Sequence, residues 1–167
     1  MKKSKILIAL TVFSMILMPV LFVFGAGTVT QQLDKYPNAN LRILTLSFTG
    51  DASNGTVPTS TTSAADTTDM LGWFIYTIQT IPGTTGPTSL YDCTISDTAG
   101  LDVAGGMLAN RSSTVAEKIV PKIDSGSGLF GGVLVDSALA VACTGTTVPS
   151  ATWTMKAVLT KEAVLTK

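Results

Sequence analysis

Alternation of apolar and polar residues is the feature that most constrains the fold of this chain. Four segments alternate with a period of two, which is the pattern of a half-buried β-strand. Their apolar positions are Leu44, Leu46 and Phe48; Tyr91, Cys93 and Ile95; Val133, Val135, Leu139, Val141 and Cys143; and Trp153, Met155, Ala157 and Leu159. Residues 71–81 are apolar on both parities, which predicts a central strand covered on both faces. Threonine, valine and isoleucine are abundant and favour strands, so we expect an all-β fold.

Turn-forming segments separate the expected strands. Residues 51–55, 82–87, 125–128 and 144–150 are rich in Gly, Pro, Asn, Ser and Thr. This spacing predicts a single β-sandwich or jelly-roll-like domain of about 7–8 antiparallel strands. The polar stretch 56–69 contains almost no large apolar side chain, and we expect it to be an exposed loop of the same domain.

Residues 1–27 have the order of a secretory signal peptide. Lys2, Lys3 and Lys5 precede a run of apolar residues from Ile6 to Phe24, and the small residues Gly25, Ala26 and Gly27 follow it. We therefore expect a signal helix in 1–27, a secreted or cell-surface domain in 28–167, and membrane contact only through the signal segment. The alternative is an N-terminal anchor that is not cleaved, because the run is just long enough to span a bilayer.

Charge and composition argue against catalysis and against nucleic-acid binding. The whole chain has 11 basic and 11 acidic side chains and no histidine. Removing the three lysines of residues 1–27 leaves eight basic against eleven acidic side chains, a formal charge of −3. Without an imidazole there is no Ser-His-Asp or Cys-His site, and scattered cations give no phosphate-binding stripe. We expect no enzymatic activity, no cofactor, no metal and no nucleic-acid partner.

Aspartates in the expected turns are the one feature that keeps calcium open as an alternative. Calcium requires clustered oxygen ligands, whereas aspartates in turns more often cap backbone N–H groups. The aspartates concerned are Asp66 and Asp69 in the polar stretch, and Asp92, Asp97 and Asp102 around a turn.

Two cysteines are candidates for a disulfide. Cys93 and Cys143 both fall on the apolar parity of their strands, and an exported protein meets an oxidising environment. Closing a loop of about fifty residues would stabilise the fold by roughly 3 to 4 kcal/mol. The alternative is two buried free thiols.

The C-terminus carries a duplicated hexapeptide. KAVLTK at 156–161 is followed by EAVLTK at 162–167, and the even repeat length keeps Leu159 and Leu165 on the same side of a strand. We expect a duplicated strand whose Val158, Leu159, Val164 and Leu165 could pair with a neighbouring subunit. The alternative is a frayed tail or a neutral duplication.

Over residues 44–159 the chain resembles a family of small, mostly uncharacterised proteins encoded by tailed phages and prophages. The motifs are FTGDASNG (48–55), GWFIYTIQTIPG (72–83), PTSLYD (87–92), DTAGLDVAGG (97–106) and ANR (109–111). The resemblance implies a structural component of a virion.

Two functions follow as hypotheses. The first is a non-enzymatic structural or assembly protein, exported and acting through self-association or contact with other structural subunits. The alternative is a monomeric secreted binding module that holds a glycan or surface ligand with the loops at one end of the sandwich.

Overall fold

The chain forms an all-β fold, as the alternation predicts. The computed structural model describes residues 26–124, 128–162 and 165–166. Within them every strand pair is antiparallel, and the helices are limited to one short α-helix and one 3-10 turn. The expected signal helix lies almost wholly in residues 1–25, outside the described part. None of the helices in the described ranges has the length and hydrophobicity needed to cross a membrane.

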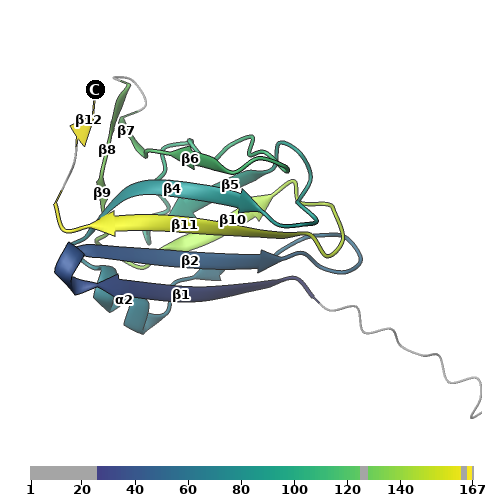
Figure 1. Cartoon of the computed structure of the whole chain (residues 1–167), viewed down its shortest axis with the longest axis horizontal. Helices are drawn as coiled ribbons and strands as arrows, with labels where there is room; N and C mark the ends of the chain where they lie inside the picture. The colour runs from purple at the N-terminus through teal and green to yellow at the C-terminus, as the bar shows by residue number, and fades with distance from the viewer. Residues whose placement is uncertain (1–25, 125–127, 163–164, 167) are drawn as a thin grey trace, which may run out of the picture.

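The larger sheet has six strands and forms the front layer in Figure 1. Its order is β1 (Thr28–Tyr36), β2 (Leu41–Thr49), β11 (Thr152–Thr160), β4 (Phe74–Pro82) and β6 (Glu117–Ile119), with β9 (Val133–Leu134) also paired to β4. The N-terminal strand β1 is therefore an edge strand, whereas β11, the last strand of this sheet in the sequence, is central.

Two three-stranded sheets complete the fold. One has the order β3 (Ser60–Thr61), β10 (Ala140–Thr144) and β5 (Asp92–Ser96). The other has the order β12 (Leu165–Thr166), β8 (Leu129–Gly131) and β7 (Lys122–Asp124). The described residues thus contain twelve strands instead of the expected 7–8. Six of them have only two or three residues, which is too short for alternation to predict.

The core lies between the larger sheet and the β3-β10-β5 sheet. The inward residues of β2 and β11 and those of β5 and β10 belong to one buried cluster. At its centre the rings of Phe48 and Trp153 stack 4.9 Å apart, and Tyr91 packs against Trp153 at 5.7 Å. The alternating residues named from the sequence on β2, β5 and β11 are all buried.

Two strand predictions need correction. β4 is central and begins at Phe74, but only one of its faces is buried in the core, and the other is half-buried. The alternating run 133–143 is two strands, because the chain bends around Ser137. β9 then pairs with β4 of the larger sheet, and β10 pairs with β5 of the smaller one.

The polar stretch 56–69 is mostly exposed, but it is not a loop throughout. It contains β3 and most of the helix α2 (Ala64–Met70). Ser63 caps this helix by accepting a hydrogen bond from the Asp66 N–H at 3.1 Å, and Met70 anchors the helix in the core. A 3-10 turn, η1 (Pro37–Ala39), joins β1 to β2.

The duplicated C-terminal segment does not continue β11. The strand ends at Thr160, and the backbone of Leu165 pairs instead with Gly131 of β8 in the same chain. The second copy of the hexapeptide therefore reaches a partner within its own chain.

Candidate functional site

Cys93 and Cys143 lie directly opposite each other on β5 and β10. Their sulfurs are 2.06 Å apart, which is bonding distance, and both side chains are buried. The Cys93 N–H donates to the Leu108 carbonyl instead of to β10. The pair is a structural link at the back of the core and contacts no cavity described below.

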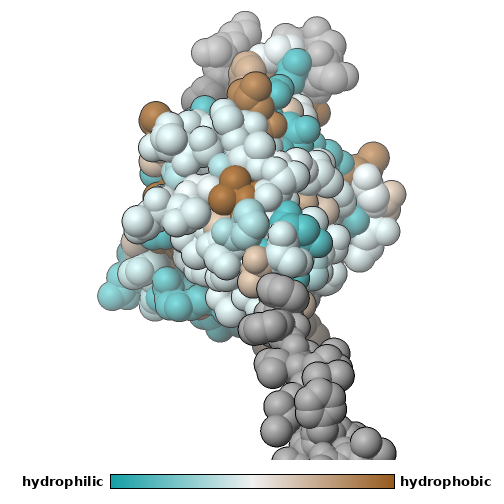
Figure 2. Space-filling model, turned by 90° about the vertical axis from the view of Figure 1, so that its right-hand side faces the viewer, coloured by the Kyte–Doolittle hydropathy of each residue, from teal (hydrophilic) through white to brown (hydrophobic). Residues whose placement is uncertain are grey.

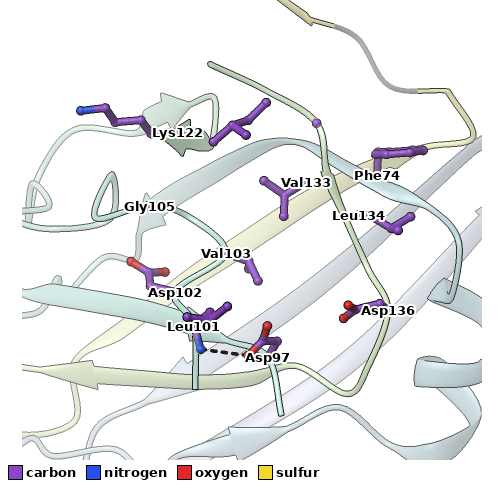
Figure 3. Close-up of a pocket in the computed structure, with 12 residues that line it drawn as sticks. Phe74, Asp97, Leu101, Asp102, Val103, Gly105, Lys122, Val133, Leu134 and Asp136 are labelled. Atoms are coloured by element: carbon purple, nitrogen blue, oxygen red, sulfur yellow. Dashed lines mark hydrogen bonds between the residues drawn. The ribbon is translucent and has the colours of Figure 1, made fainter. Parts of the chain in front are cut away.

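A groove of about 560 Å³ combines apolar and charged side chains (Figure 3). Its walls come from the 97–105 segment, β7, β9 and the start of β4. Leu101 and Leu134 expose 67% and 47% of their surface here, beside the half-buried Phe74 and Val133. Large exposed aliphatic side chains at a hollow favour contact with another molecule.

Three aspartates line the groove, but two of them are used by the backbone. Asp97 accepts a hydrogen bond from the Leu101 N–H at 2.9 Å. Asp102 accepts from Ala104 N–H at 3.0 Å and from Gly106 N–H at 2.7 Å. Asp136 is exposed and has no hydrogen-bond or ionic partner in the part of the chain described. In Figure 3 the Lys122 side chain extends away from these carboxylates.

The other aspartates considered for calcium also bind within the chain. Asp92 accepts a hydrogen bond from the Asn110 N–H, Asp66 accepts one from the hydroxyl of Ser63, and Asp69 forms an ion pair with Lys35. Over the described ranges no group of three or more His, Cys, Asp or Glu side chains could hold a metal ion.

The loops at one end of the two layers bond mainly to one another. Asp51 accepts from the backbone N–H groups of Ser53 and Asn54, and the hydroxyls of Thr88 and Thr147 lie 2.6 Å apart. Figure 2 views the molecule from the right-hand side of Figure 1, and the face it shows has mainly polar and weakly polar residues, with hydrophobic residues scattered singly. This end offers no gathered apolar surface to a ligand.

The free edge of β1 is the other exposed feature. β1 is nine residues long and pairs only with β2, and its outward backbone groups have no backbone partner among the described residues. In Figure 1 it is the outermost strand of the front sheet, with α2 beside the half that ends at Tyr36. Thr28 and Thr30 are exposed, whereas Val29 and Leu33 pack against the core.

The remaining sheet edges are short or covered. β6 and β3 have three and two residues. The outer edge of β5 receives backbone hydrogen bonds from a following segment, with Val103 N–H donating to Ile95 O at 2.8 Å and Arg111 N–H donating to Tyr91 O at 2.7 Å. β1 is therefore the one long strand edge left open in the part of the chain described.

The residues expected to form an assembly strand are placed differently. Val158 and Leu159 lie in β11, which pairs with β2 on one side and β4 on the other, and Leu159 is fully buried. A strand with two neighbours has no free edge, so these two residues cannot provide the contact. Leu165 pairs with β8, and Val164 lies outside the described residues.

The sequence reasoning missed β1. Its stretch TVTQQLDKY has only Val29 and Leu33 as aliphatic inward residues, so its alternation is weak. Comparison of this chain with protein-family models, with curated proteins and with solved structures finds no match.

Proposed function

We propose that this protein is a non-enzymatic structural subunit, exported and assembling through the open edge of β1. The observation that supports it is the outer edge of the nine-residue strand β1, which has no partner strand among the described residues, whereas the other edges are short or covered. Unpaired N–H and C=O groups along a strand readily pair with another strand. A virion or surface assembly of the kind that the sequence resembles would use such a contact.

The occupant that fits this edge is a second copy of β1. A partner strand of similar length is needed, and within the described residues a second copy offers only its own β1 as a long free edge. Like edges meet around a two-fold axis, which gives a closed dimer. The first five residues, Thr28 to Gln32, carry no charge, and the side chain of Gln31 is bonded to Ser60, Thr61 and the N-cap residue Ser63 of the same chain. An antiparallel overlap centred on Thr30 therefore opposes no like charges.

The test is to add charge at this edge and at matched positions one strand inward. Thr30→Lys with Thr28→Lys places like charges close together across the axis and should dissociate the dimer. The control is Ser47→Lys with Thr49→Lys, because Ser47 pairs with Thr30 and Thr49 with Thr28 in register. All four residues are exposed.

Light scattering coupled to size exclusion measures the outcome. We expect a dimer for the parent and for the β2 variant, and a monomer for the β1 variant. A parent that is monomeric at every concentration would refute the proposal, as would a β1 variant of unchanged size.

The groove supports a second candidate, a binding module. Exposed Leu101 and Leu134 beside the unpaired carboxylate of Asp136 suit a ligand with an apolar body and a cationic end. Asp136→Asn should weaken binding of a hexylammonium probe, seen as chemical-shift changes in the methyl groups of the leucines. Equal binding by hexanol would refute the role of the charge.

A further inference from the structure

We infer that a second pocket, beside Arg42 and Trp73, binds the carboxylate group of a small ligand. This pocket lies at the end of β1 away from the proposed overlap at Thr28 to Gln32, shares no lining residue with the groove, and has a volume of about 280 Å³. It lies where β1, η1 and the start of β2 meet the turn before β4. Its lining comprises Lys35, Tyr36, Pro37, Asn40, Leu41, Arg42 and Trp73.

The Arg42 guanidinium is held in place but lacks an acceptor. Its central carbon lies over the Trp73 ring, 4.1 Å from the ring centre, which is a cation–π contact. The Nη1 atom of Arg42 is buried and has no hydrogen-bond partner among the described residues. A buried charged donor without an acceptor is costly, and because Arg42 lines the pocket, an anion that binds its guanidinium there would offset this cost.

The charges around the pocket also favour an anion. Lys161 places its Nζ atom 5.1 Å from the centre of the same Trp73 ring, which adds a second cation. Lys35 is the third cation, and Asp69, which pairs with it, is the acid of this cluster. The hydrogen bond from Lys35 lowers the pKa of Asp69, and the nearby charge of Arg42 lowers it further. The lining residues Lys35 and Arg42 and the neighbouring Lys161 thus bring three cations to the pocket, and Asp69 pairs with Lys35.

The chemistry of the site points to a carboxylate. A planar guanidinium fork matches the two oxygens of a carboxylate, and the guanidinium of Arg42 lies over Trp73 at the pocket. The volume is at the small end of ligand sites, which suits a compact acid. Tyr36, which exposes 46% of its surface, adds an aromatic wall that a sugar ring or a short apolar body could cover.

The fluorescence of Trp73 provides the test on the full chain. The protein has two tryptophans, and Trp153 is buried in the core against Phe48, so a ligand beside Arg42 should change the emission of Trp73. We expect a saturable change on titration with galacturonate at low ionic strength, and none with galactose, which has the same ring without the carboxylate. Binding of acetate at the same site would indicate that a free carboxylate is sufficient for recognition. Binding of galacturonate but not acetate would indicate that the ligand is a sugar acid. Either outcome supports the inference.

Matched charge variants distinguish the pocket from general attraction of anions. Arg42→Gln should weaken galacturonate binding about tenfold or more, because a charge-assisted hydrogen-bond pair is lost. Lys118→Gln removes one cation from an exposed position of β6 and should leave binding unchanged. If Arg42→Gln does not fold, as judged by circular dichroism, Lys161→Gln, which changes an exposed side chain, should still weaken binding two- to threefold.

Three results would overturn the inference. The first is a fluorescence change with phosphate and none with any carboxylate, and the second is an equal fluorescence change with galactose and with galacturonate. The third is a loss of galacturonate binding in Lys118→Gln as large as that in Arg42→Gln.

Discussion

Removing the link between Cys93 and Cys143 should destabilise the fold strongly. The two residues are 50 apart in sequence, and the loop between them contains four of the six shortest strands and all lining residues of the groove except Phe74. The change to make is the double substitution Cys93→Ala with Cys143→Ala, which removes the crosslink and leaves no thiol in the chain, since it has only two cysteines.

The magnitude follows from loop closure in the unfolded chain. For a loop of this length the chain-entropy model gives about 14 cal/mol/K, or about 4 kcal/mol at 25 °C. The double variant should therefore lose about 4 kcal/mol of unfolding free energy, which for a domain of this size lowers the melting temperature by about 15 °C. The two buried sulfurs also pack in the core, so the alanine variant should lose slightly more than the reduced parent.

Urea unfolding of three samples separates these contributions. The oxidised parent, the parent with reductant and the alanine variant are compared by tryptophan fluorescence, with the slope checked for each. Alkylation of unfolded, unreduced parent should find no free thiol. A difference below about 1 kcal/mol between oxidised and reduced parent would refute the reasoning, and so would two alkylated thiols in the unreduced sample.

Three further predictions test the packing. Burial raises the pKa of Tyr91 to about 12, so above pH 10 the unfolded state loses this proton while the folded state keeps it, and the free energy of unfolding should fall by about 1.4 kcal/mol per pH unit up to about pH 12. Tyr91→Phe should remove this part of the alkaline loss of stability, measured by urea titrations at pH 9 and pH 11. An unchanged loss in the variant would contradict the prediction. Ser63→Ala should cost about 1 kcal/mol by removing the cap of α2, measured by thermal unfolding, with Ser53→Ala as a control for a hydroxyl outside a helix. Deleting residues 162–167 should leave the melting temperature nearly unchanged and the dimer intact, because β12 contributes only two ladder residues; a monomeric product would place the contact in the tail instead of β1.

Alternation in the sequence was enough to find the long strands that bury one face. On β11 each odd-numbered residue from Trp153 to Leu159 is buried and each even-numbered residue is half-buried, as a period of two requires. The same rule placed Cys93 and Cys143 on inward faces. It could not show that they lie opposite each other, because that depends on the pairing of two strands that are distant in sequence.

Short elements and edges were decided by tertiary contacts. α2 has a local signal, Ser63 followed three residues later by Asp66, but its seven residues are held in place by Met70 in the core. β12 pairs with β8 because the chain turns after Thr160, and nothing in a repeated hexapeptide specifies that turn.

The sequence by itself determined the fold class and the inward residues of the long strands, because alternation is a local property of the chain. Only the tertiary structure decided that β1 lies at an edge, that β11 lies between β2 and β4, and that Arg42 lies over the Trp73 ring. Each of these depends on segments far apart in sequence, whose pairing is set by how the whole core packs and not by the residues of either segment alone.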